Sequence, residues 1–340
     1  MKRYFFAILG ILLSTALLLG VLETTAHWIV YWRYGYAGKS YGIFMQDPEL
    51  GFIHRPNSYN SLTSLNNYAL RNREDVMDPK PSHSLRILAV GGSTTFGYNL
   101  ANEDTFTEQL EKRLRAVPGH EKDQVLNAGT IAYSANHNLI RLKRLLPKLY
   151  PDYVLIYEGI NENTNEYELL KQGVTLDAKE KKFGLVNKDF LQARWLWTHS
   201  VLLKWLDYRV KTSRDIPAAV KASLPKTSDR PDVNAWEIEN FKWALHEMIT
   251  ACRAQHARPI VIRYATVRTA LEYRYFSDLA AATARQEGVP VCDMEGVFER
   301  TGNRMDSLFI HTGVHVTSEG AALLANELFE IILQDQKNHA

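Results

Sequence analysis

Little in this sequence points to a disulfide framework, a metal centre or a nucleic-acid partner. Its 340 residues include two cysteines, Cys252 and Cys292, which are too few for a disulfide framework. They could pair in an oxidising compartment, but two isolated buried thiols are the preferred interpretation. No cluster of His, Cys, Asp or Glu has ligand spacing, so we expect neither a metal nor another cofactor. The formal net charge of +2 gives no strong field that would favour nucleic acid. Repeats and low-complexity runs are absent, and a hydrophobic content of 46% predicts a globular domain with a full core.

One long apolar run is present, at the amino end of the chain. No charged residue occurs between Arg3 and Glu23, which is long enough for a helix that spans a bilayer. A cleaved signal peptide would have a shorter apolar region and would end at a small-x-small site, whereas Thr24-Thr25-Ala26 is a poor cleavage site. We therefore expect a cytoplasmic tip and an uncleaved transmembrane anchor over residues 1–25.

Basic residues beside the anchor indicate its orientation. Lys2 and Arg3 should remain in the cytoplasm by the positive-inside tendency, although Arg33 and Lys39 on the other flank weaken this argument. The rest of the chain would then lie outside the cytoplasm, in a periplasm or the extracellular space. The sequence thus predicts a single-pass membrane protein, with the membrane as its partner through this helix.

Beyond the anchor, the chain divides into a juxtamembrane lead-in over 26–85, which looks irregular over 37–85, and a larger domain over 86–338. In the domain, apolar runs typical of strands alternate with amphipathic helical patterns, which predicts a parallel sheet covered on both faces. A helical insertion at about 166–235 interrupts this rhythm. The expected strands are 87–90, 125–129, 151–157, 259–264 and 289–293, and the expected helices are 105–117, 135–149, 235–254, 271–287 and a last one from 317 or 318 to about 334.

Four polar signals lie where strands end or where the last helix begins. The strand Ile87–Val90 runs through two glycines into Ser93, Gly129 ends the second strand, Asn161 follows the third, and His315 precedes the last helix. Because the carboxyl ends of parallel strands meet at one edge of a sheet, these residues are expected to share one crevice.

The chemistry of these residues fits nucleophilic catalysis. The Ser93 hydroxyl would be the nucleophile and His315 its base, since a serine needs a base within hydrogen-bond reach. The N–H groups of Ser93 and Gly129, with the Asn161 amide, would stabilise an oxyanion. A helix start near His315 would disfavour a positive charge and help to keep the imidazole neutral. His311 competes with His315 as the base.

This set of Ser93, Gly129, Asn161 and His315 resembles the four named positions of the SGNH (GDSL-type) hydrolase superfamily. The resemblance extends over residues 86–335, and Asn67-Tyr68-Ala69-Leu70-Arg71 resembles a segment that often precedes the domain in membrane-anchored bacterial members. It implies a flavodoxin-like three-layer α/β/α sandwich. It also implies hydrolysis of esters, or acyl transfer, through a serine acyl-enzyme.

Two positions depart from the family pattern. Gly92 replaces the aspartate that usually stands beside the nucleophile, a variant familiar among anchored members. Thr312 occupies the position of the acid that supports the histidine, and a threonine cannot stabilise an imidazolium as a carboxylate does. A Ser-His pair could work with help from a carbonyl or hydroxyl, Asp306 or Asp293 could substitute as the acid, or activity could be lost.

The leading hypothesis is an extracytoplasmic serine esterase that removes acyl groups, O-acetyl above all, from a glycan or envelope polymer. Its substrate would be an acylated carbohydrate or a lipid-like ester. Two alternatives stay open at this point. One is a polysaccharide O-acyltransferase that uses the same site, and the other is a catalytically degenerate module that binds glycans or acts as a scaffold. No protein partner is predicted.

Overall fold

A five-stranded parallel sheet forms the centre of the molecule. The computed structural model describes residues 2–34, 38–60, 62–162, 200, 202–203, 235–266, 271–302, 307–310 and 313–339. The strands are β5 (Arg86–Gly91), β6 (Gln124–Asn127), β7 (Tyr153–Tyr157), β8 (Arg258–Arg263) and β9 (Val291–Asp293), in the order β6-β5-β7-β8-β9. Every neighbouring pair is parallel. This is the strand order of flavodoxin-like folds.

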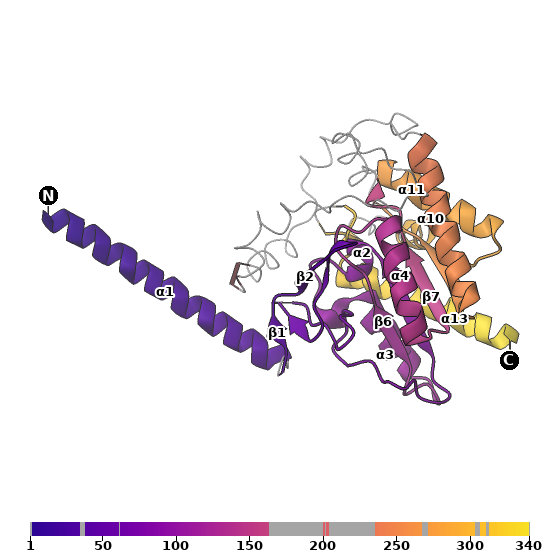
Figure 1. Cartoon of the computed structure of the whole chain (residues 1–340), viewed down its shortest axis with the longest axis horizontal. Coiled ribbons are helices and arrows are strands. Elements are labelled where there is room, and N and C mark those ends of the chain that lie inside the picture. The colour runs from indigo at the N-terminus through magenta and orange to yellow at the C-terminus, as the bar shows by residue number, and fades with distance from the viewer. Residues whose placement is uncertain are drawn as a thin grey trace.

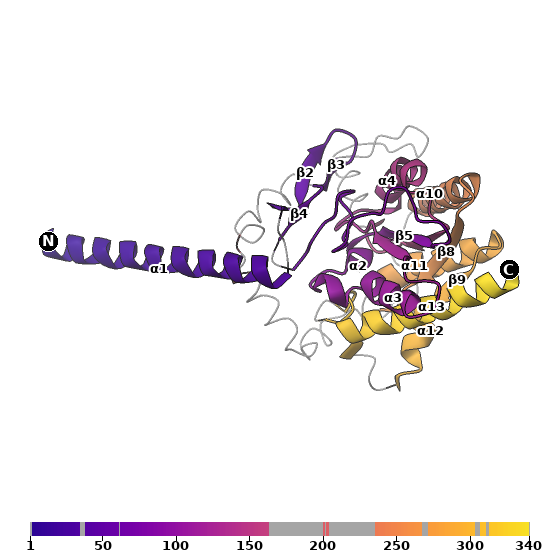
Figure 2. The same cartoon turned by 90° about the horizontal axis from the view of Figure 1, so that it is seen from below.

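Helices cover both faces of the sheet, as Figure 2 shows. Alternate residues of β5 point to opposite faces, so that Ile87 and Ala89 join one buried apolar cluster while Leu88 and Val90 join the other. The predicted three-layer α/β/α sandwich is therefore confirmed. One layer contains α4 (Ala135–Leu149), α10 (Ala235–Ala254) and α11 (Leu271–Gln286), and the other contains α3 (Phe106–Arg115), α12 (Met294–Glu299) and α13 (Ser318–His339).

The alternating pattern predicted the main elements closely. All five strands begin and end within two residues of the expected positions, and α4 and α10 have the expected bounds. The last helix runs past residue 334 to His339. Asp335 in this extra turn accepts hydrogen bonds from Tyr153 and Arg258, which tie the end of α13 to the sheet.

The lead-in contains regular structure that the sequence did not predict. Phe52 and Leu50 are buried there against Tyr133, and Asp47 accepts the backbone N–H groups of Glu49 and Leu50 in the turn of a hairpin. The expectation of an irregular segment is thus corrected. The sequence did not reveal these strands because they are too short to show a period. Its elements are β1 (Ser40–Tyr41) parallel to β4 (Ser58–Tyr59), and β2 (Phe44–Asp47) antiparallel to β3 (Gly51–His54).

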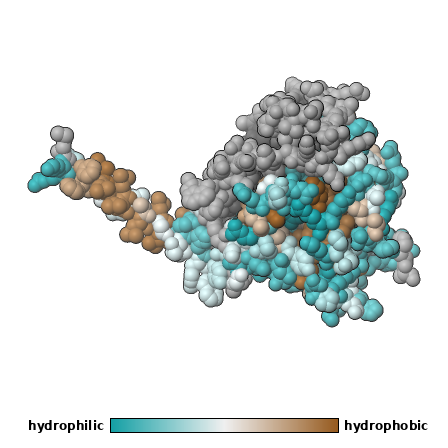
Figure 3. Space-filling model, viewed as in Figure 1, coloured by the Kyte–Doolittle hydropathy of each residue, from teal (hydrophilic) through white to brown (hydrophobic). Residues whose placement is uncertain are grey.

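Helix α1 (Lys2–Tyr34) projects away from the rest of the molecule, as Figures 1 and 3 show. An 18-residue window of its segment Lys2–Ile29 has a mean hydropathy of 2.6, and no residue of that window is buried in the protein. By length and composition it can cross a membrane, and such a helix fits an anchor or a signal sequence.

The predicted helical insertion at about 166–235 lies almost wholly outside the described residues. Of this stretch the structure describes Ser200, the pair 202–203 and residue 235. The Ser200 hydroxyl donates to the Glu23 carboxylate of α1 over 2.7 Å. Both cysteines, Cys252 and Cys292, are free and buried, as predicted.

Candidate active site

Ser93 follows β5, the strand at which the order of strands in the sheet reverses. Strand β5 pairs with β6 on one side and with β7 on the other, so the connection from β5 runs to one side and the connection from β6 returns past β5 to the other side. Crevices at such switch points are where open α/β sheets bind ligands. After Gly91 and Gly92 the chain turns into the short helix α2 (Ser93–Phe96), whose first residue is this serine.

A hairpin before α13 places His315 opposite Ser93. The N–H of Ile310 donates to the carbonyl of His315 over 2.9 Å, and Phe309 forms an antiparallel bridge with Val316. The His315 Nε2 atom lies 2.8 Å from the Ser93 Oγ atom. In the tautomer that carries its proton on Nδ1, this nitrogen accepts the hydroxyl proton, which is the geometry that a general base requires.

Asn161 lies beside Gly92, in the turn between β5 and α2, and is held by a backbone carbonyl. Its Nδ2 atom donates to the Tyr133 carbonyl over 2.8 Å, which leaves its second amide hydrogen for another acceptor. A Cβ at residue 92 would lie 2.6 Å from this Nδ2 atom. A side chain at residue 92 would therefore require the Asn161 amide to shift.

Gly129 packs against the backbone of α2. A Cβ at this position would lie 2.2 Å from the Phe96 nitrogen and 2.6 Å from the Thr95 carbonyl carbon, so only glycine fits against α2. Its N–H donates to the Asn127 Oδ1 atom over 2.9 Å. In this structure that N–H thus points to Asn127 rather than to a site for an oxyanion, and Gly129 contributes close packing.

Of the residues predicted to support His315, or to replace it as the base, only Asp293 is described. Thr312, Asp306 and His311 lie outside the described residues. Asp293 is described, and its carboxylate binds Arg263 over 2.8 Å and caps α12. Burial raises the pKa of Asp293, but the hydrogen bonds from Arg263 and from the Gly296 N–H, together with the nearby arginine charges, leave the pKa below its ordinary value. The structure therefore corrects the suggestion that Asp293 supports the histidine, since this carboxylate is committed elsewhere.

Three residues near the site were missed by the sequence analysis. The ring centroid of Tyr98 lies 4.8 Å from that of His315. Tyr133 donates through its hydroxyl to the Phe52 carbonyl of the lead-in, and the Asn127 amide donates to the Thr95 carbonyl of α2 over 2.8 Å. Only Asn127 had a signal in the sequence, as a polar residue at the end of a strand.

Glu162 attaches the loop that carries Asn161 to the amino end of α4. Its Oε1 atom accepts the Ala135 N–H over 2.9 Å and so satisfies the amino end of α4 in place of the N-cap Ser134, whose hydroxyl contacts His137. Burial raises the pKa of Glu162 to about 7, against the opposing effect of that hydrogen bond. Burial beside Glu162 also raises the pKa of Glu158.

This shift predicts a pH-dependent stability. The folded protein holds the Glu162 proton more tightly than the unfolded chain between pH 4.5 and about 7, so the free energy of unfolding falls as pH rises through that window. For the unmodified protein we expect the free energy of unfolding to fall by on the order of 2 kcal/mol between pH 5 and pH 8 because Glu162 ionises. Glu162→Gln keeps the acceptor for Ala135 but cannot ionise, so this fall should be absent in the variant. Urea unfolding at pH 5 and pH 8 measures it.

The matched control is Glu239→Gln, which changes an exposed carboxylate of α10. It should retain the pH dependence of the unmodified protein. Equal pH slopes for Glu162→Gln and the unmodified protein would contradict the assignment of this effect to Glu162.

No group of three or more His, Cys, Asp or Glu side chains in the described part of the chain could hold a metal ion. The site thus consists of a hydroxyl, an imidazole and amide donors at the carboxyl edge of a parallel sheet. These are the groups that acyl transfer through a serine uses.

The fold and these groups define the class of serine ester hydrolases. The chain belongs to the GDSL-like lipase/acylhydrolase family, whose sequence pattern matches residues 89–323. No curated protein matches the sequence significantly.

Among solved structures, three hydrolases illustrate the similarity. A putative lipolytic protein of the G-D-S-L family from Desulfitobacterium hafniense is 15% identical, with 72% of this chain and 98% of that chain covered and a TM-score of 0.44. The lipase/acylhydrolase from Enterococcus faecalis is 18% identical, with coverages of 73% and 95% and a TM-score of 0.45. Axe2, an acetylxylan esterase from Geobacillus stearothermophilus, is 14% identical, with coverages of 72% and 93% and a TM-score of 0.44.

Proposed function

We propose that this protein is a membrane-anchored, extracytoplasmic esterase that removes acyl groups from a glycan or another envelope polymer, with O-acetyl groups as its main substrate. The observation that carries the proposal is the 2.8 Å contact between the Ser93 hydroxyl and the His315 imidazole. A hydroxyl needs such a base to attack an ester at neutral pH.

The first half-reaction forms an acyl-enzyme. The Ser93 Oγ atom attacks the ester carbonyl while His315 Nε2 takes its proton. The resulting oxyanion accepts the Ser93 N–H and the second amide hydrogen of Asn161. When the intermediate collapses, His315 returns the proton to the leaving alcohol. Water then attacks the acyl-enzyme, its proton passes to His315, and the acid is released as Ser93 regains its hydrogen.

The other predicted residues have subsidiary roles in this proposal. Gly129 packs against α2 and leaves the oxyanion to two donors. Asp306 and Thr312 stay candidates for the support of the imidazole. The hydrolase domain over 86–338 works together with the lead-in, whose Phe52 carbonyl anchors Tyr133 and through it Asn161.

The amino-terminal helix α1 supports the proposed location and substrate class. Lys2 and Arg3 at its start favour a cytoplasmic amino end, which would leave the site outside the cytoplasm. An esterase tethered there meets acylated polymers of the envelope before it meets cytoplasmic esters.

Labelling with a fluorophosphonate probe tests the nucleophile. We expect the folded protein to be labelled at Ser93 and Ser93→Ala to give no label, because the hydroxyl oxygen forms the bond to phosphorus. Folded protein that takes up no label and hydrolyses no short acyl ester would overturn the proposal.

Product analysis tests the substrate class. Acetate released from an acetylated glycan at a higher kcat/KM than decanoate from a long-chain ester is the expected result. Acetyl transfer to a glycan acceptor in excess of hydrolysis would instead identify an O-acyltransferase with the same nucleophile.

A further inference from the structure

Arg71 carries a buried positive charge on the lead-in, close to the proposed nucleophile. Its side chain is 1% exposed, and its residue number places it before the region that matches the family, which begins at residue 89. The guanidinium donates from Nη1 to the carbonyls of Phe96 and Gly97, and from Nη2 to that of Leu100. Three carbonyls of one turn thus converge on a single side chain.

The turn held by these bonds is the carboxyl end of α2. Gly97, in a left-handed conformation with φ +81°, ends that helix, and the Gly97 and Tyr98 N–H groups both donate to the Ser93 carbonyl over 3.0 Å. The same turn carries the Tyr98 ring that packs against the imidazole of His315. Arg71 therefore contacts the segment that connects the nucleophile to the base.

We propose that Arg71 is a positioning residue for the reaction: its buried guanidinium clamps the turn after α2 and thereby holds Ser93 and Tyr98 in register with His315. The proposal rests on the function proposed above. It assigns the lead-in a part in catalysis beyond that of a spacer between membrane and domain.

The chemistry of arginine suits this task better than that of lysine. A guanidinium presents five N–H donors in a rigid plane, so it can reach separate carbonyls at once, whereas an ammonium group is compact and strongly hydrated. The Arg71 guanidinium carbon also lies 4.3 Å from the centroid of the Phe96 ring, a cation–π contact that offsets part of the lost hydration.

Arg71 is itself held rigidly by the sheet. Its N–H donates to the Asn127 carbonyl over 2.8 Å, and the side chain of its neighbour Asn72 accepts the Asn127 N–H and donates to the Val125 carbonyl. Asn127 in turn donates to the Thr95 carbonyl. The clamp thus connects the end of β6 to the carboxyl end of α2 and to the turn that follows it.

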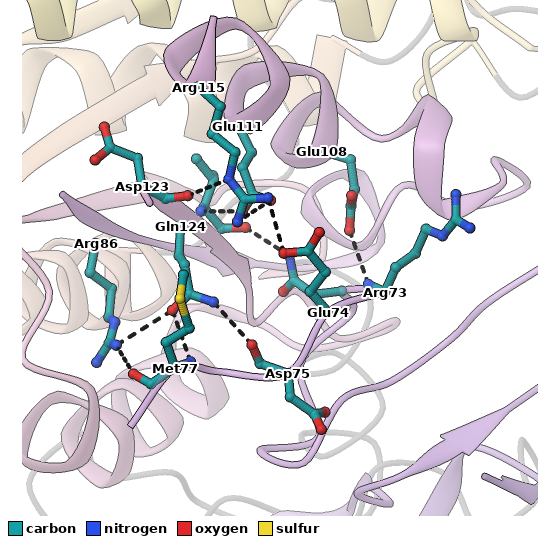
Figure 4. Close-up of polar contacts among 12 residues, drawn as sticks. Arg73, Glu74, Asp75, Met77, Arg86, Glu108, Glu111, Arg115, Asp123 and Gln124 are labelled. Atoms are coloured by element: carbon teal, nitrogen blue, oxygen red, sulfur yellow. Dashed lines mark hydrogen bonds and ion pairs between the residues drawn. The ribbon is translucent and has the colours of Figure 1, made fainter. Parts of the chain in front are cut away.

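Figure 4 shows that the bonds continue along the lead-in after Arg71. Arg115 of α3 binds the Glu74 carboxylate over 3.0 Å, and Gln124 of β6 bonds to the backbone of Asp75 and Met77. The Arg73 N–H donates to Glu108 over 3.1 Å. These bonds hold residues 73–77 against α3 and β6, and so restrict the movement of the backbone next to Arg71. A positioning role requires such a fixed backbone.

The test uses the full-length protein in detergent and compares Arg71→Met, Arg71→Lys and the control Arg73→Met. Arg73 lies in the same segment, its side chain is exposed, and its bond to Glu108 uses the backbone N–H. Three quantities are measured: the rate of fluorophosphonate labelling of Ser93, the kcat and KM for p-nitrophenyl acetate per labelled site, and the thermal midpoint.

We expect Arg71→Met to lower kcat and the labelling rate by about 10²-fold with a much smaller change in KM, because displacement of a nucleophile by ~1 Å costs that much. Arg71→Lys should recover part of the loss, and millimolar guanidinium should raise the labelling rate of Arg71→Met. Arg73→Met should behave as the unmodified protein.

The outcomes separate the two proposals. If the unmodified protein takes no label, the proposed function fails and this inference falls with it. If the unmodified protein is labelled and folded Arg71→Met matches it within about threefold, the positioning role alone is overturned, and a lowered thermal midpoint at unchanged kcat would mean a purely structural role. Should Arg71→Met not fold, Arg71→Lys decides by the same comparison.

Discussion

Replacement of His315 by alanine is expected to lower kcat/KM for p-nitrophenyl acetate by about 10⁴-fold or more. The Nε2 atom lies 2.8 Å from the Ser93 hydroxyl, so the substitution leaves the nucleophile protonated and without a base. The protein should stay folded, because His315 is only half-buried and its hairpin is held by the backbone bonds of Phe309 and Ile310. Initial-rate kinetics at pH 8 measure the loss.

Two comparisons make this result specific. The double variant Ser93→Ala with His315→Ala should be no slower than either single variant, since the two groups act as one unit. The control His246→Ala removes an exposed histidine of α10, bonded to Glu287, and should retain full activity. Activity of His315→Ala within about tenfold of the unmodified protein would show that another group, with His311 the first candidate, serves as the base.

The sequence could reveal the sheet because its signals are local. Each central strand is an unbroken apolar run that ends at glycine or a polar residue, and a fully buried parallel strand needs that pattern. The ends of these runs place Ser93, Gly129 and Asn161 at the carboxyl edge of the sheet. The start of the last helix indicated His315 as the base for this serine, and the family resemblance supported the pairing.

Contacts that depend on register and turn geometry were beyond such reasoning. Asp293 looked available as an acid, yet the parallel register of β8 and β9 sets it directly beside Arg263. The N–H of Gly129 looked available for an oxyanion, yet the Asn127 side chain turns back to accept it. In both cases the sequence identified a capable group, and a neighbour invisible in the sequence determined its partner.

The lead-in shows the same limit. Its strands of two or four residues carry no period that sequence analysis can detect, and Arg71 bonds mainly to backbone carbonyls, which no residue type marks. The one available signal was an arginine at the end of the run Asn67-Tyr68-Ala69-Leu70-Arg71, which resembles a segment that often precedes the domain in membrane-anchored members. A charge that is 1% exposed in the folded protein implies a structural or catalytic use.

Gly92→Ala is expected to lower kcat by about 10²- to 10³-fold while KM changes little. The added methyl group would lie 2.6 Å from the Asn161 Nδ2 atom and 3.2 Å from the Tyr133 carbonyl, so the amide must move away. Loss of one preorganised oxyanion donor has that effect on acyl transfer. Steady-state kinetics with p-nitrophenyl acetate, normalised by active-site titration, measure it. The aspartate of the usual family pattern would require the same displacement and should fail to improve the enzyme.

A double-mutant cycle tests whether the loss passes through Asn161. If the methyl group acts by displacing that amide, Asn161→Ala should cost a similar factor, and Gly92→Ala combined with Asn161→Ala should be no slower than Asn161→Ala alone. Multiplied losses would mean that the methyl group disturbs Ser93 directly. Full activity of Gly92→Ala would contradict the assignment of Asn161 as an oxyanion donor, because no side chain fits at residue 92 while that amide stays in place.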